Sequence, residues 1–276
     1  MISNKEKILF IMFQGGGSNL KSWNEYTESK FLDRLKKIGK VYVYQDKIYN
    51  TMYYNKNNPL RKDYDSNLDF DLNYNNLDKH IKYVYDDIII KYKNIDTYKF
   101  IPIGWSAGGY LALYFSQIYY KKCKSCVLLD PALITPNNIN LRIESFKKDK
   151  SDRVYYPITN NKYKKLLLQL KENKDDTWKI IVTTSNYIRT LFIKDKLNIK
   201  FNNVPVISFY YINKPYVNEF GDEFNNKTKK EEIKILSKIN KNNYKPHILI
   251  NSGHCVFNKI DNANFIISKI NDIIIK

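Results

Sequence analysis

Apolar and polar positions alternate along the chain in two recurring patterns. Short, nearly continuous apolar runs are separated by longer stretches in which apolar residues recur every three or four positions. A short continuous run is typical of a strand covered on both faces, and the longer periodicity is typical of an amphipathic helix. The apolar runs predict strands at 7–13, 40–45, 98–104, 125–130, 204–212 and 247–251.

Helices are predicted between these strands. Their expected positions are roughly 19–38, 75–93, 106–121, 228–240 and 258–273. Such strand–helix–strand alternation favours a mainly parallel sheet of about six strands with helices on both faces, which is an α/β fold.

Two long intervals interrupt the alternation. Residues 46–74 are polar and rich in Asn, Asp and Tyr, which indicates a surface excursion. Residues 131–203 are too long for a plain connection and contain helical patterns. We therefore expect residues 1–276 to form a single domain, with 131–203 as a helical cap insertion over one edge of the sheet.

The chain is strongly basic, with 46 Lys and Arg against 28 Asp and Glu and a net charge of +18. Such a surface can attract nucleic acid, anionic membranes or acidic substrates. Lys, Asn, Ile and Tyr are abundant throughout, however, as codons from an AT-rich genome would produce, so a nucleic-acid partner is not favoured. No stretch reaches the roughly 18 apolar residues of a membrane span, so no transmembrane segment is expected.

Cysteine usage points to a reducing compartment. Cys123 and Cys126 form a lone C-x-x-C pair, without the second pair that would complete a zinc site. Two packed thiols in a cytoplasmic protein are the simplest interpretation, and no metal is expected.

Candidate chemistry centres on the segment "FIPIGWSAGGYLALYF", residues 100–115. A strand that ends at Gly104 and a helix that begins just after Ser106 leave almost no room to turn. The central residue is then forced into a strained conformation with its side chain exposed, and glycine is needed on either side. The pattern predicts a nucleophile elbow with Ser106 as the nucleophile.

A serine nucleophile needs a base, and the chain has three histidines. His80 falls in a predicted helix, and His247 is expected to start the last strand and to pack structurally. His254, in "INSGHCVFNKI", follows that strand at the same edge of the sheet as Ser106. We therefore predict His254 as the base.

A run of glycines follows the first strand, in "FQGGGSN". Successive glycines let backbone N–H groups face a small ligand. The alternative, a phosphate-binding loop, lacks the G-x-x-x-x-G-K-[ST] pattern. An oxyanion hole is the better interpretation.

Together these motifs resemble the alpha/beta-hydrolase family of serine esterases and lipases, in the order glycine turn, elbow, histidine. The methylesterase branch, with H-G-W-G-x-N and G-W-S-x-G-G, looks most similar. The matching segments are Gln14 to Asn19 with Trp23, Gly104 to Gly109, and His254 to Phe257. Gln14 departs from the family's usual histidine, and the family's first two strands have no counterpart.

The resemblance implies an alpha/beta-hydrolase fold and an oxyanion hole formed by the backbone N–H groups of Gly16 and Ala107. Gly15 or Gly17 could replace Gly16, because three identical residues leave the alignment open.

The acid of the triad has several candidates. The family most often places it just beyond the strand at 204–212, where this chain has Asn213 and Lys214. The later acidic residues of that loop are Glu219, Asp222 and Glu223. Asp130, in "VLLDPA", resembles the acid of pancreatic-type lipases. Asp130 is favoured, with Asp222 next.

The predicted function is that of a serine hydrolase, a carboxylesterase- or lipase-like enzyme that cleaves a carboxylic ester or thioester through an acyl-enzyme. It needs no cofactor, and its substrate is expected to be a small acyl ester, anionic or lipid-like. The alternatives are an acyltransferase or thioesterase, a serine peptidase of the same fold, or a degenerate hydrolase that acts as a basic binding protein.

Overall fold

The computed structural model describes most of the predicted elements of the chain. The described residues are 6–15, 23–24, 27–44, 77–131, 204–211, 222–240, 242–249 and 252–275. The predicted excursion at 46–74 lies outside them, and so does the predicted cap at 131–203 apart from Pro131.

The described elements alternate between strands and helices, as the hydrophobic pattern predicts. The strands are β1 (Lys7–Phe13), β2 (Lys40–Tyr44), β3 (Tyr98–Trp105), β4 (Cys126–Leu129), β5 (Val206–Tyr211) and β6 (Tyr244–Leu249). The helices are α1 (Phe31–Lys36), α4 (Leu77–Lys91), the short 3₁₀ helix η4 (Ile95–Thr97), α5 (Gly108–Ile118), α9 (Asp222–Ile239) and α10 (Ile260–Ile275).

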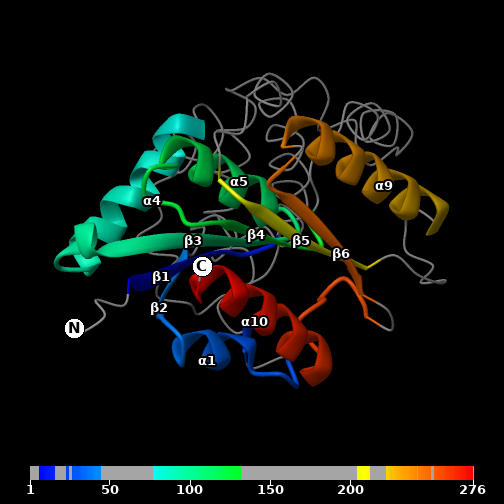
Figure 1. The fold of residues 1–276 in the computed structure, drawn as a ribbon, viewed down its shortest axis with the longest axis horizontal. Coiled ribbons are helices and arrows are strands. Elements are labelled where there is room, and N and C mark those ends of the chain that lie inside the picture. The colour runs from blue at the N-terminus through cyan, green and yellow to red at the C-terminus, as the bar shows by residue number, and fades with distance from the viewer. Residues whose placement is uncertain are drawn as a thin grey trace, which may run out of the picture. The chain divides into compact units, whose positions relative to one another are not determined.

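All six strands form one sheet in the order β2-β1-β3-β4-β5-β6, and every pairing is parallel. Helices α1 and α10 cover one face, and α5 and α9 cover the other (Figure 1). The prediction of a parallel α/β sheet with helices on both faces is thereby confirmed. Among the described residues, no helix has both the length and the apolarity to cross a membrane.

Contacts within the chain divide it into two compact units. The first comprises 1–45, 85–133 and 200–276 and contains the whole sheet. The second comprises 46–84 and 134–199. Every feature of the candidate site described below belongs to the first unit.

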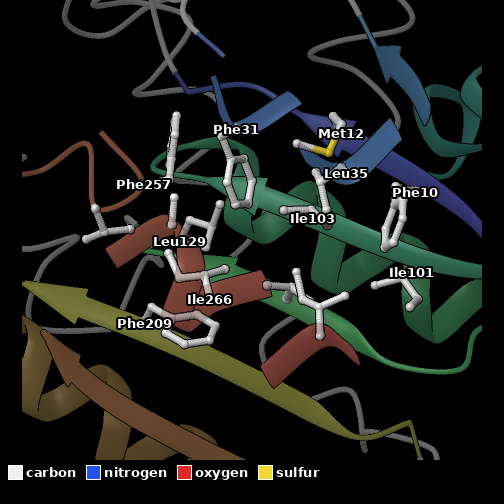
Figure 2. Packing of buried hydrophobic residues seen from close by; sticks show 14 of the residues in the cluster. Phe10, Met12, Phe31, Leu35, Ile101, Ile103, Leu129, Phe209, Phe257 and Ile266 are labelled. Carbon is white, nitrogen blue, oxygen red and sulfur yellow. The ribbon is translucent and has the colours of Figure 1, made fainter. Parts of the chain in front are cut away.

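A hydrophobic core cluster lies between the sheet and the α1/α10 layer (Figure 2). Alternate residues of each strand point into it, because successive side chains of a strand face opposite ways. Its fully buried members include Phe10, Met12, Phe31, Leu35, Ile101, Ile103, Leu129, Phe209, Phe257 and Ile266. Burying one such side chain contributes about 1.5–3 kcal/mol, so this layer holds the sheet in place.

The register of the sheet brings the carboxyl ends of its central strands together. Phe13 pairs with Gly104, Trp105 with Leu129, and Leu129 with Phe209. The residues that follow β1, β3 and β4 therefore emerge at one edge. In open α/β sheets this edge is where ligands bind.

Three predicted boundaries are wrong. Among the described residues of the helix expected at 19–38, the α-helix is limited to α1, because residues 27–30 lie outside it in turn and irregular backbone and Lys30 adopts a left-handed φ of 50°. Helix α9 begins six residues before the expected start at 228. Strand β6 begins at Tyr244, so His247 lies inside the strand instead of starting it. Pro246 is tolerated there because β6 is an edge strand.

Candidate active site

Ser106 occupies a sharp turn between β3 and α5. Its φ is +51°, in the left-handed region that non-glycine residues rarely adopt. The Ser106 N–H donates a 3.1 Å hydrogen bond to the Leu129 carbonyl, and the Gly109 N–H donates a 2.9 Å bond to the Ser106 carbonyl. Neighbouring main chain therefore holds a conformation that costs about 1–3 kcal/mol. This is the strained strand–turn–helix backbone that the sequence predicts for a nucleophile elbow.

The glycines around Ser106 are required by close packing of main chain. A Cβ at Gly104 would lie 2.4 Å from the Gly108 carbonyl oxygen, and a Cβ at Gly108 would lie 2.2 Å from the Phe13 carbonyl oxygen. Any side chain at either position would overlap with backbone that cannot move away cheaply. Glycines two positions before and two positions after the serine therefore allow β1, β3 and α5 to pack this closely.

Gly15, the first glycine after β1, lies close to Ser106. A Cβ built on Gly15 would lie 3.0 Å from Ser106 Cβ. Ala107, which the resemblance places in the oxyanion hole, is the N-cap of α5. The other two glycines of the run, Gly16 and Gly17, lie outside the described residues, so the choice among the three stays a prediction.

Asp130 and His254 form a hydrogen bond. His254 Nδ1 lies 2.7 Å from Asp130 Oδ2. The Asp130 side chain is fully buried, whereas the His254 side chain is 55% exposed. Because Nδ1 is engaged by the carboxylate, Nε2 is the ring nitrogen left to act on a hydroxyl or a substrate. The imidazole is therefore oriented from its buried side and accessible from the other.

Asp130 is itself held in a constrained turn after β4. Its φ is +40°, and its N–H donates a 2.7 Å hydrogen bond to the Phe209 carbonyl. Its Oδ1 accepts a 3.1 Å hydrogen bond from the Tyr211 N–H. The carboxylate is thus aimed along the edge of the sheet by β5.

The loop that carries His254 is anchored near Ser106. It leaves β6, which is three strands away from β3 in the sheet. Trp105 Nε1 donates a 3.0 Å hydrogen bond to the His254 carbonyl oxygen. Phe257 packs on Trp105, with ring centroids 5.4 Å apart, and stacks on Trp23, with centroids 4.9 Å apart. The residue before the predicted nucleophile therefore helps to position the residue predicted as base.

Hydrogen bonds tie the same loop to the segment before α1. The Ser29 hydroxyl donates a 2.6 Å hydrogen bond to the Phe257 carbonyl, and the Ser29 N–H donates a 3.0 Å bond to the Asn258 carbonyl. Asn258 Oδ1 accepts a 3.2 Å bond from the Glu28 N–H. The His254 loop is thus held by hydrogen bonds from Trp105 and from residues 28–29.

Lys229, on α9, also contacts Asp130. Its Nζ lies 2.8 Å from Asp130 Oδ1 and 3.0 Å from Oδ2, and it donates a 2.6 Å hydrogen bond to the Tyr211 carbonyl. The Lys229 side chain is 14% exposed. Sequence reasoning missed this residue, because one lysine in a chain with 46 Lys and Arg carries no signal of its own.

The remaining candidates lie elsewhere or outside the described residues. Glu219 is not among the described residues, and Asp222 and Glu223 are described only as the first backbone positions of α9. His80 is likewise described only as a backbone position, in α4. His247 packs between Phe209 and Phe265, and burial lowers its pKa.

The three cysteines are free thiols in apolar surroundings. Burial raises the pKa of Cys126 and of Cys255 to about 12, and it raises that of Cys123 well above its ordinary value. These thiols are therefore neutral near pH 7, as packed structural cysteines are. No group of three or more His, Cys, Asp or Glu side chains that could hold a metal ion occurs in the described part of the chain.

Comparisons with known proteins give the fold. No protein-family model and no curated protein sequence matches the chain. Among solved structures, the chain is similar to the peroxisomal alpha-beta-hydrolase Lpx1 of Saccharomyces cerevisiae, with a TM-score of 0.56 and 15% identity over 99% of this chain and 78% of that one.

Two further structures show the same similarity. A soluble variant of monoglyceride lipase from Saccharomyces cerevisiae has a TM-score of 0.54 and 12% identity, over 97% of this chain and 86% of that one. A hydrolase from Oleispira antarctica has a TM-score of 0.51 and 13% identity, over 97% of this chain and 91% of that one. At these identities the similarity is one of fold.

Proposed function

Since the chain has the alpha/beta-hydrolase fold, we propose that it is a serine hydrolase that cleaves a carboxylic ester or thioester. In this proposal Ser106 is the nucleophile, His254 the general base and Asp130 the acid. The observation that carries it is the 2.7 Å hydrogen bond between His254 and the buried Asp130, at the edge where Ser106 emerges in a strained turn.

The first step is acylation of the serine. His254 Nε2 takes the proton of the Ser106 hydroxyl while Oγ attacks the acyl carbonyl, and the imidazolium then protonates the leaving alcohol or thiol. Asp130 holds the ring in the tautomer with the proton on Nδ1. Water, activated by the same ring, then attacks the acyl-enzyme and releases the acid and the free serine.

The oxyanion is assigned to backbone donors. The Ala107 N–H begins the first turn of α5, where the free N–H groups and the helix dipole favour negative charge. By resemblance the second donor is the Gly16 N–H, next to the Gly15 backbone that contacts Ser106. Donors of this kind contribute about 10²–10³ in turnover each.

For the substrate, we propose a small acyl ester, with anionic ones favoured by the net charge of +18. A panel of p-nitrophenyl esters of increasing chain length, each with and without a terminal carboxylate, tests this directly. A higher kcat/KM for the carboxylate-bearing member of each pair supports the proposal, and a lower one contradicts it.

A fluorophosphonate probe tests the enzyme class. The wild-type protein should be labelled stoichiometrically, and Ser106→Ala should abolish labelling. Ser252→Ala serves as a matched control, because Ser252 also follows a strand at the carboxyl edge but belongs to no proposed role. Absence of labelling in a folded wild-type protein would favour the degenerate, ligand-binding alternative.

A further inference from the structure

Helix α9 is joined to β5 at both ends of that strand. Lys229 and Asn240 are about three helical turns apart, so their side chains leave α9 on the same face. Asn240 Nδ2 donates a 3.1 Å hydrogen bond to the Val204 carbonyl, just before β5 begins. Lys229 Nζ donates a 2.6 Å hydrogen bond to the carbonyl of Tyr211, the last residue of β5. The two side chains therefore hold opposite ends of the helix against one strand.

The Lys229 end also reaches both oxygens of the Asp130 carboxyl group. Nζ lies 2.8 Å from Oδ1 and 3.0 Å from Oδ2. Oδ1 in addition accepts the 3.1 Å hydrogen bond from the Tyr211 N–H, whereas Oδ2 lies 2.7 Å from His254 Nδ1. One oxygen thus faces β5 and the other faces the imidazole, and Nζ bridges the two.

A second contact is needed to fix the plane of this carboxyl group. The terminal torsion of an aspartate side chain has a broad, roughly two-fold profile, so the plane turns easily unless its neighbours hold it. The Tyr211 N–H contacts one oxygen only. Lys229 Nζ contacts both, and it is itself fixed by the Tyr211 carbonyl and lies 5.2 Å from the centroid of the Tyr211 ring. The Lys229 side chain is therefore a rigid support for the orientation of Asp130.

We propose that Lys229 is a positioning residue, which holds Asp130 in the orientation that presents Oδ2 to His254. This inference rests on the proposed function for its catalytic meaning. Lys229 acts through Asp130, and the helix α9 thereby becomes part of the support of the site. A misplacement of about 1 Å in a catalytic constellation can cost about 10² in rate, so such a support has a measurable effect.

Steady-state kinetics of Lys229→Met test the proposal, because methionine keeps most of the stem and removes Nζ. We expect kcat to fall about 10- to 100-fold, with KM within about twofold of the wild type. Asn240→Leu is the matched control, since it removes the other attachment of α9 to β5. It should lower the urea midpoint and leave kcat unchanged. Equal losses of kcat in the two variants would overturn the proposal, because they would indicate only a loosened helix.

A double variant tests whether Lys229 acts through Asp130. Once Asp130→Asn has removed the carboxyl group, no orientation remains for Lys229 to hold. Adding Lys229→Met to Asp130→Asn should therefore change kcat/KM by less than about twofold. If the losses of the two single variants multiply in the double variant, Lys229 acts independently of Asp130 and the proposal is wrong.

The Tyr211 amide reports on the Asp130 orientation without requiring turnover, because its N–H donates to Oδ1. In Lys229→Met we expect its NMR proton signal to move upfield and its hydrogen exchange to become faster. The amide of Ile207, in the same strand, should stay at its wild-type position. An unchanged Tyr211 amide in folded Lys229→Met would overturn the proposal.

Lys229→Arg is the second variant, for use if Lys229→Met does not fold, because arginine keeps N–H donors at the end of a long stem. Here kcat and the Tyr211 amide should change together or stay unchanged together. A tenfold loss of kcat with the amide in its wild-type position would contradict the proposal, and so would a displaced amide with wild-type kcat.

The amide also separates this inference from the proposed function. If the wild type resists the fluorophosphonate but the Tyr211 amide moves in Lys229→Met, the proposed function fails and the support of Asp130 by Lys229 stands. If the wild type is labelled normally and Lys229→Met changes neither kcat nor the amide, the role of Lys229 fails alone.

Discussion

Trp105 donates a 3.0 Å hydrogen bond from its indole nitrogen to the main-chain carbonyl of His254. The residue that precedes the predicted nucleophile along the chain thus anchors the residue predicted as base, 149 positions later. The same indole packs against the His254 ring and against Phe257. The elbow sequence therefore contributes, through Trp105, an anchor for the loop that carries His254.

Trp105→Phe should remove that anchor while keeping an aromatic ring. One such hydrogen bond contributes about 1 kcal/mol, and a loosened base should lower kcat/KM by about tenfold. Steady-state kinetics on a p-nitrophenyl ester measure this. Tyr92→Phe is the control, because it deletes one side-chain bond to the Val41 carbonyl away from the site. Equal activity losses in the two variants would contradict a specific role for Trp105.

Asp130→Asn should lower kcat by about 10⁴-fold, because an amide cannot hold the imidazole in the tautomer that the base needs. Asp222→Asn and Glu223→Gln are the corresponding changes at the competing candidates and should retain full activity. Circular dichroism confirms that each variant is folded. Near-normal turnover in Asp130→Asn, with a large loss in Asp222→Asn, would reassign the acid to α9.

Gly108→Ala should destabilise the protein by about 3 kcal/mol, because the added methyl carbon would lie 2.2 Å from the Phe13 carbonyl oxygen. Gly253→Ala is its matched control, since a Cβ there meets nothing within 4 Å. The control should change the free energy of unfolding by less than about 0.5 kcal/mol. Urea denaturation of the two variants gives the comparison, and similar costs at both sites would refute the steric explanation.

The thiols should resist alkylation in the native protein. Burial raises the pKa of Cys126 and Cys255 to about 12, so below that pH both are almost entirely the unreactive thiol. In the unfolded chain they ionise near pH 8.5, so raising the pH above that value favours unfolding. We expect iodoacetamide to modify neither residue at pH 8 without urea and to modify both in 8 M urea, as counted by mass spectrometry. Rapid native modification would show that these side chains are not packed.

Much of the fold could be predicted from local pattern. The strand positions and the parallel α/β class follow from short apolar runs, which a two-sided sheet requires. The helix expected at 19–38 failed because its amphipathic pattern includes residues 27–30, which contacts with the distant His254 loop hold in turns. Long-range hydrogen bonds of this kind leave no periodic signal.

The candidate site was only partly predictable, for a similar reason. Ser106 has a local signature, because steric demands of one turn fix both flanking glycines. The proximity of Asp130 to His254 depends on how far the loop after β6 crosses the sheet edge, which no short stretch encodes. Lys229 depends in addition on how α9 lies against β5. The catalytic roles of all these residues stay predictions until they are tested.

The contact between Ser29 and Phe257 closes a loop of 228 residues, whereas the sheet beneath it is assembled from nearer neighbours. Contacts of such long sequence separation form late in folding and at the greatest entropic cost. The contacts that position the candidate site should accordingly form last during folding and break first during unfolding. Gentle warming or dilute denaturant should therefore abolish the proposed activity while the secondary structure stays intact.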